Sequence, residues 1–108
     1  MWLRWQAPID DDPMAHAAAL AFLSDDVPSD AIRAALPDAA DWFFVSLDHT
    51  VWFHAPVRAD EWQLHTFRCD RFVGGRGLAI GEIYAADGLH VATVAQEMLF
   101  RAPRDAVT

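Results

Sequence analysis

Residues 12–24 read DPMAHAAALAFLS, and this stretch decides the fold class because it joins a helix start to an apolar run. Asp12 can cap the free backbone N–H groups of the first turn, and Pro13 suits the first helical position. The side chains that follow are apolar around most of the helix circumference, with His16 as the polar exception. We therefore expect a buried helix whose alanines let a sheet pack closely against it.

The sequence on either side of this helix predicts strands and one further short helix. Residues 2–6 predict an edge strand that Pro8 ends. A second helix is expected over Asp30–Leu36 with Ser29 as its cap, after which the hydrophobic period changes to two residues. Strands are expected at 43–54, 61–72, 78–84 and 89–100, with Asp87-Gly88 as a tight hairpin turn. This order indicates an α+β domain with one dominant helix and an antiparallel sheet.

Small residues in the third of these strands indicate where something bulky packs. Gly77, Ala79 and Gly81 share one face of the expected strand. Their lack of side-chain volume leaves room for a neighbouring element on that face of the sheet.

Composition limits the classes of protein that fit. The chain has 108 residues, enough for one domain, and a net charge of −8, which argues against nucleic-acid binding. Its single cysteine, Cys69, excludes an internal disulfide and makes a cysteine-based metal site improbable. No apolar run approaches the roughly 18–20 residues that span a bilayer, and no signal-peptide pattern opens the sequence. We expect a cytoplasmic protein that does not insert into membranes.

Four segments carry a resemblance to a known family: FLSD at 22–25, SLDHTVWFHAP at 46–56, GGRG at 74–77 and DGLHVATVAQE at 87–97. In this order and spacing they resemble the C-terminal half of the acyl-CoA thioesterase II family, over almost the whole chain. The resemblance implies a hotdog fold, in which an antiparallel sheet wraps around a central helix, here the Ala-rich one. We expect residues 1–108 to form a single hotdog domain.

The resemblance also implies a function and a set of catalytic residues. Members of the family hydrolyse fatty acyl-CoA to free acid and CoA, without a cofactor or metal, and are built from two fused hotdogs. The catalytic positions match Asp25, Ser46 and Gln96 here, with Ser46 where the family usually has Thr. Because the N-terminal hotdog is missing from this sequence, we expect the chain to pair with itself, as a homodimer or larger, or with a second hotdog domain.

These three side chains suit the chemistry of thioester hydrolysis, which needs a water held and partly deprotonated beside the carbonyl. Asp25 follows the expected helix, where a carboxylate opposes the helix dipole, and it is the expected base. The alternative is that Asp25 merely caps the turn through neighbouring backbone groups. Ser46 and Gln96 would orient the water, although a strand Ser or a Gln bonded to backbone would be unremarkable singly.

Arginines beside the glycine-rich bend are candidates for contact with the CoA phosphates. Arg71 and Arg76 can bind phosphate through paired N–H groups, and Gly74 and Gly75 expose backbone N–H groups. The alternative, which also covers Arg68, is a solvated face beside a β-bulge.

Strict alternation along residues 43–54 predicts which side chains face the site. It places Asp48 on the face of Ser46 as a supporting residue near the substrate, and His49 on the opposite face as a hydrogen-bonded core residue. Phe44 and Trp52, on the face of Ser46, would line an acyl channel or pack on the helix. The histidines of the chain lack the spacing of a metal site.

Two other functions are compatible with the same residues. The chain could be a non-catalytic half that binds acyl-CoA and needs a partner domain for activity. It could also be a hydratase acting on 2-enoyl thioesters, which requires an Asp/His acid–base pair facing the ligand. The expected orientation of Asp48 and His49 to opposite faces argues against a hydratase.

Overall fold

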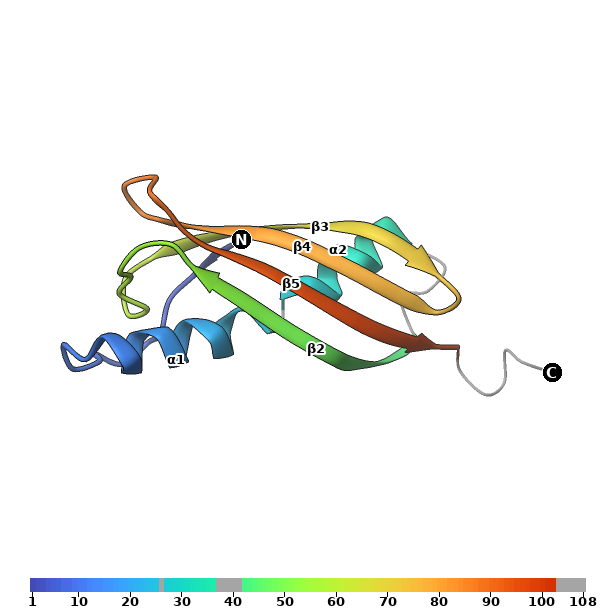
Figure 1. The fold of residues 1–108 in the computed structure, drawn as a ribbon, viewed down its shortest axis with the longest axis horizontal. Helices are drawn as coiled ribbons and strands as arrows, with labels where there is room; N and C mark the ends of the chain where they lie inside the picture. The colour runs from blue at the N-terminus through green and yellow to red at the C-terminus, as the bar shows by residue number, and fades with distance from the viewer. Residues whose placement is uncertain (26, 37–41, 103–108) are drawn as a thin grey trace.

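The part of the chain that the structure describes folds into one antiparallel sheet with two helices. The computed structural model describes residues 1–25, 27–36 and 42–102. The elements are β1 (Trp2–Leu3), α1 (Pro13–Leu23), α2 (Val27–Ala35), β2 (Phe43–Phe53), β3 (Gln63–Val73), β4 (Arg76–Ala85) and β5 (His90–Arg101). The sheet has the spatial order β1-β3-β4-β5-β2, with every neighbouring pair antiparallel (Figure 1). The α+β class is confirmed, and β1 is an edge strand as expected.

Helix α1 starts as the sequence predicts. The Asp12 carboxylate accepts a hydrogen bond from the Met14 N–H over 3.0 Å, and Pro13 is the first helical residue. Leu20 is fully buried in a core cluster with Ile83 and other sheet residues. However, Met14 and Phe22 are 75% and 70% exposed, so the expected burial on all sides is wrong. On this outer side Phe22 has a partial contact with the ring of Trp5, at a ring distance of 5.8 Å.

Helix α2 begins three residues earlier than expected, at Val27, and Ser29 lies inside it rather than capping it. Its fully buried Ile32 packs on the small residues of β4. A Cβ atom on Gly77 would lie 2.8 Å from Cδ1 of Ile32, too close for two carbon atoms. The expectation that this small-residue face accommodates a bulky element is therefore confirmed, and the element is α2.

Both tight turns of the sheet lie at glycines. Gly74 and Gly75 have φ of +62° and +80° and join β3 to β4 directly. Positive φ at both residues is what a two-residue hairpin turn of type I′ requires. Gly88 has φ of +93°, and the Asp87 carboxylate accepts a hydrogen bond from the Leu89 N–H over 3.0 Å. A hairpin turn therefore lies at the predicted place, but its loop is not the expected two residues: the Gly88 N–H donates to the Ala85 carbonyl over 2.9 Å, so Ala86 and Asp87 are the central residues of the turn.

The ladder between β2 and β5 contains a β-bulge that the sequence did not reveal. Ser46 pairs with Met98 and Asp48 with Glu97, so Leu47 is an extra residue, and His49 pairs with Gln96. Because Met98 and Gln96 lie on one face of β5, Ser46 and His49 also share that face, and Asp48 lies with Glu97 on the other. The placement of Asp48 on the face of Ser46 is therefore wrong. In a regular ladder Asp48 would have opposed Gln96.

Candidate active site

The three side chains expected to act in catalysis lie together, with Asp25 and Ser46 both bonded to the amide group of Gln96. Its Nε2 donates hydrogen bonds to Oγ of Ser46 over 2.8 Å and to Oδ1 of Asp25 over 3.1 Å. Gln96 is 1% exposed, whereas the Asp25 side chain is 54% exposed. A buried amide thus holds a carboxylate and a hydroxyl together at the surface of the site.

The end of α1 explains why Asp25 is available for this contact. Ser24 ends the helix, and its N–H donates to the Leu20 carbonyl over 3.0 Å. The Asp25 N–H donates to the Phe22 carbonyl over 3.2 Å, which completes the turn through backbone groups. The Asp25 carboxylate contacts Gln96 in place of the turn, which favours the site over the capping alternative.

His49 belongs to the same cluster, and the sequence analysis missed it. Its Nδ1 lies 2.8 Å from Oε1 of Gln96 and 3.7 Å from Oδ1 of Asp25, and its Nε2 lies 2.8 Å from Oγ of Ser24. The bulge at Leu47 turns the ring to this face. A histidine on an otherwise apolar strand face was the available signal, because a buried imidazole needs polar partners.

The arrangement can activate a water molecule. A carboxylate that is half exposed can accept a proton from a water, and the adjacent Ser46 hydroxyl can orient that water. The Ser46 hydroxyl also lies 3.2 Å from the Asp48 carbonyl, to which it donates. His49 and Gln96 supply the buried hydrogen bonds that fix this geometry.

The residues expected to bind substrate do not join the cluster in this chain. Asp48 accepts a hydrogen bond from the Glu97 N–H over 3.0 Å, and Arg76 forms an ion pair with Glu97 over 3.3 Å. Arg71 pairs with Leu78, which in turn pairs with Glu97, so Arg71 and Arg76 lie on the sheet face opposite Gln96. Gly74 and Gly75 form the turn next to Arg76. CoA binding by these residues stays a prediction.

The two aromatic residues considered for an acyl channel, Phe44 and Trp52, lie on opposite faces of the sheet. Phe44 stacks on Phe100 at a ring distance of 5.6 Å, and the Arg33 guanidinium lies 4.6 Å from the Phe44 ring centre. Trp52 pairs with Thr93 and lies on the face opposite His49. Phe44 therefore packs on the helical side, and the expected common face for the two is wrong.

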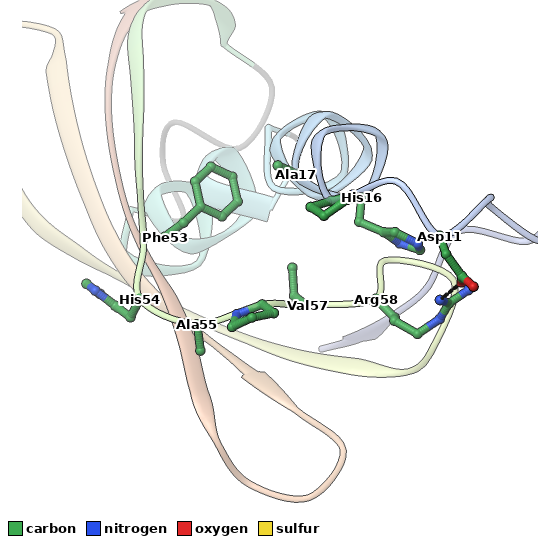
Figure 2. Close-up of a pocket in the computed structure, with 10 residues that line it drawn as sticks. Asp11, His16, Ala17, Phe53, His54, Ala55, Val57 and Arg58 are labelled. Carbon is green, nitrogen blue, oxygen red and sulfur yellow. Dashed lines mark hydrogen bonds and ion pairs between the residues drawn. The ribbon is translucent and has the colours of Figure 1, made fainter.

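A cavity of about 540 Å³ lies at the other end of α1 from Asp25. Its apolar lining comes from Ala17 of α1 and from the end of β2 with the segment after it, namely Phe53, Ala55, Pro56 and Val57. Figure 2 shows Phe53 and Ala17 on facing walls, with His54 pointing away. The volume lies in the range of small-molecule sites.

Arg58 at the rim of this cavity is paired with carboxylates, so it offers no free positive charge. Arg58 donates to Asp11 over 2.6 Å (Figure 2). It also donates to Asp60 over 3.0 Å, and these bonds raise the pKa of the Arg58 guanidinium. The Ile9 N–H, followed by Arg58, holds the pKa of the Asp60 carboxyl below its usual range. Because the positive charge is already paired, the cavity favours an uncharged, apolar occupant.

In residues 1–25, 27–36 and 42–102, no three His, Cys, Asp or Glu side chains are placed to hold a metal ion. Neither helix in this part of the chain has the length and apolar character needed to cross a bilayer.

The fold and the cluster define a hotdog domain of the thioesterase class. An acyl-CoA thioesterase II from Mycobacterium marinum, TesB2, superposes with a TM-score of 0.85 at 39% identity, over 96% of this chain and 41% of that one. A hot-dog-like protein from Thermanaerovibrio acidaminovorans superposes with a TM-score of 0.69 over 99% of this chain and 82% of that one, and at 19% identity shows the fold alone. The expected hotdog fold is confirmed.

Family membership follows from the sequence comparisons. A family model described as the acyl-CoA thioesterase C-terminal domain matches residues 1–100. This chain belongs to that family. Acyl-coenzyme A thioesterase 8 of Rattus norvegicus is 38% identical over 104 residues, which cover 93% of this chain and 32% of that protein. The chain thus spans about a third of the length of the curated relatives it matches.

Proposed function

We propose that this chain provides the catalytic site of a fatty acyl-CoA thioesterase. A water held between Asp25 and Ser46 attacks the thioester carbonyl, and Asp25 accepts a proton from that water. The C–S bond then breaks, the water oxygen remains in the free acid, and the proton passes to the CoA thiolate. The observation that carries this proposal is the buried Gln96 amide, which donates to both Asp25 and Ser46.

The cavity beside Ala17 supports a fatty acyl chain as the apolar part of the substrate. Ala17 lies in the N-terminal half of α1 and Asp25 lies two residues beyond its last residue, about 12 Å apart along the helix axis. A chain whose carbonyl lies at the cluster can extend along α1 and place its tail in the cavity. The apolar walls, beside a rim whose arginine is already paired, suit such a tail.

The exposed edge of the sheet favours a second hotdog unit as the partner of this chain. Strand β2 is an edge strand of 11 residues, and apolar side chains along it are exposed, with Phe43 at 72% and Val45 at 57%. Such an edge leaves backbone N–H and C=O groups without a ladder partner on one side and favours pairing with another strand. We propose a homodimer or larger assembly, or a pair with a separate hotdog domain; a strict monomer in gel filtration would contradict it. A cytoplasmic location remains a sequence-based prediction.

A 2-enoyl-CoA hydratase is the second candidate function, because one observation favours it. The Asp25 carboxylate and the His49 imidazole lie 3.7 Å apart in the site, and they form the acid–base pair that Asp48 and His49 could not. Such a pair could catalyse the addition of water to a conjugated double bond, instead of the hydrolysis of the thioester.

The test compares thiol release from acyl-CoAs of several lengths with loss of conjugation in 2-enoyl-CoAs. We expect thiol release by the wild-type chain and a fall of about 100-fold or more in kcat for Asp25→Asn, the scale of general-base catalysis. Asp70→Asn, a substitution of an exposed carboxylate on β3, is the matched control and should retain activity. Binding of acyl-CoA without turnover would instead favour the non-catalytic half, and water addition without thiol release would favour the hydratase.

A further inference from the structure

The hydrogen bonds of the cluster fix the orientation of the Gln96 amide. The Ser46 hydroxyl donates to the Asp48 carbonyl, so its oxygen accepts from Nε2 of Gln96. The Asp25 carboxylate can only accept, and it too receives a hydrogen from Nε2. The amide nitrogen therefore faces Asp25 and Ser46, and the amide oxygen faces His49.

This orientation determines where His49 carries a hydrogen. Because Oε1 of Gln96 can only accept, Nδ1 of His49 at 2.8 Å must be a donor. The other ring nitrogen, Nε2, lies 2.8 Å from Oγ of Ser24. The Ser24 hydroxyl has a second acceptor within reach, the Ala21 carbonyl at 2.9 Å.

The Ser24 hydroxyl can consequently satisfy the ring in two protonation states. When the ring is neutral, Ser24 donates its hydrogen to Nε2. When the ring carries a second proton, Nε2–H donates to the Ser24 oxygen, and the hydroxyl donates to Ala21. The bond from Nδ1–H to Gln96 is the same in both states, so rotation of one hydroxyl absorbs the change.

We propose that His49 and Ser24 form a positioning pair that keeps the Gln96 amide aimed at Asp25 and Ser46 whether or not the imidazole is protonated. The pair touches no reacting atom and acts through Gln96, so its effect on turnover rests on the function proposed above. Asp25 at 3.7 Å is the ionised group closest to the ring within the described residues. Asp48 and Glu97 lie on the opposite face of the sheet.

Two substitutions of His49 separate the hydrogen bond from the titrating ring. In His49→Asn the side-chain amide nitrogen can replace the Nδ1–H donor, whereas His49→Leu removes it and leaves Oε1 of the buried Gln96 unsatisfied. We expect kcat to fall about tenfold or more in His49→Leu, with little change in KM, and to stay within about threefold of wild type in His49→Asn. Thermal unfolding confirms that both variants fold.

Substitution of Ser24 tests the two-state hydroxyl. Ser24→Ala removes the acceptor that a protonated ring needs, and a buried N–H without a partner is costly. We expect the kcat of Ser24→Ala to decline more steeply than that of wild type when the pH is lowered from about 8 to about 5, the interval in which histidine side chains generally change charge. Ser24→Thr, which keeps a hydroxyl, should restore the wild-type profile. Identical profiles for Ser24→Ala and wild type would overturn the role of Ser24.

The NMR signals of the Gln96 side-chain amide give a readout that does not depend on turnover. In wild type and His49→Asn we expect two distinct, slowly exchanging N–H signals, and in His49→Leu their averaging or rapid exchange. Unchanged signals and unchanged kcat in His49→Leu would disprove the positioning role. If wild type hydrolyses no acyl-CoA while the amide signals still respond as expected, the thioesterase proposal fails and the positioning pair stands.

Discussion

Oε1 of Gln96 lies 2.8 Å from Nδ1 of His49, a contact that exists because Leu47 is an extra residue in the β2–β5 ladder. Without the bulge, the residue opposite Gln96 would be Asp48, and a second carboxylate would lie beside Asp25. Two like charges at such a distance repel each other. The bulge replaces that repulsion with a hydrogen-bond donor.

The hydroxyl at position 46 can be tested with a conservative pair of substitutions. Ser46→Thr keeps the oxygen that accepts from Gln96, so we expect thiol release within about threefold of wild type. Ser46→Ala leaves one N–H of the buried Gln96 amide without a partner and removes a hydrogen-bond partner of the proposed water. We therefore expect kcat to fall about 10- to 100-fold. Steady-state kinetics with one acyl-CoA checks both. Equal activity of the two variants would show that the Ser46 hydroxyl has no part in turnover.

The cavity at Ala17 predicts a chain-length effect. Ala17→Leu adds three carbon atoms to the wall that faces Phe53, which shortens the space available to an acyl tail. We expect kcat/KM for long-chain acyl-CoA to fall about tenfold, while short chains that end before the cavity are hydrolysed as by wild type. Ala18→Leu, at an exposed position next in sequence, is the control. A uniform loss for all chain lengths would contradict a tail site.

The contact between Gly77 and Ile32 predicts a compensating pair of substitutions. Gly77→Ala places a Cβ atom 2.8 Å from Cδ1 of Ile32 and should lower the free energy of unfolding by about 1–3 kcal/mol. Ile32→Val removes that Cδ1 atom and alone costs about 0.5–1.5 kcal/mol. In the double variant the shortest contact is gone and only the contacts with Cγ2 and Cγ1, at 3.1 and 3.3 Å, remain, so its loss should be smaller than the sum of the two single losses. Urea unfolding measures all four proteins, and simple additivity would show that α2 does not pack on Gly77.

The dependence of the free energy of unfolding on pH should reveal whether His65 is buried and neutral in the folded chain. Burial, followed by the nearby N-terminal ammonium, lowers the pKa of His65 to about 4. Between about pH 6.5 and 4 the unfolded chain binds a proton there that the folded chain does not, so the free energy of unfolding falls as the pH falls. The slope from this residue is at most about 1.4 kcal/mol per pH unit. His65→Phe cannot titrate, and its stability should depend less on pH across this window. Parallel curves for the two proteins would contradict a buried, neutral His65.

The fold was largely predictable because its signals are local. Asp12, Pro13 and the Asp87-Gly88 turn have backbone preferences that operate within a few residues, and all lie where expected. The expected burial of α1 on all sides is wrong because the apolar side chains of Met14 and Phe22 stay largely exposed, although Phe22 contacts the ring of Trp5. Composition shows that a surface is apolar, but not which element covers it.

The site was only partly predictable. Asp25, Ser46 and Gln96 were found through family resemblance, and they do converge. His49 was assigned to the wrong face and Asp48 to the site, because a strict period of two cannot anticipate an extra residue at Leu47. The bulge depends on pairing between strands far apart in sequence, which no local pattern records.

The bulge at Leu47 also makes the site a reporter of correct strand alignment. A slip of β2 by one residue along β5 would turn every side chain of the slipped segment to the other face and would remove the imidazole from Gln96. Misaligned molecules could retain the sheet and most of its hydrogen bonds yet lack a complete cluster. In a preparation of refolded protein, the fraction of active molecules would therefore measure how many chains reached the native alignment, which circular dichroism alone would overestimate.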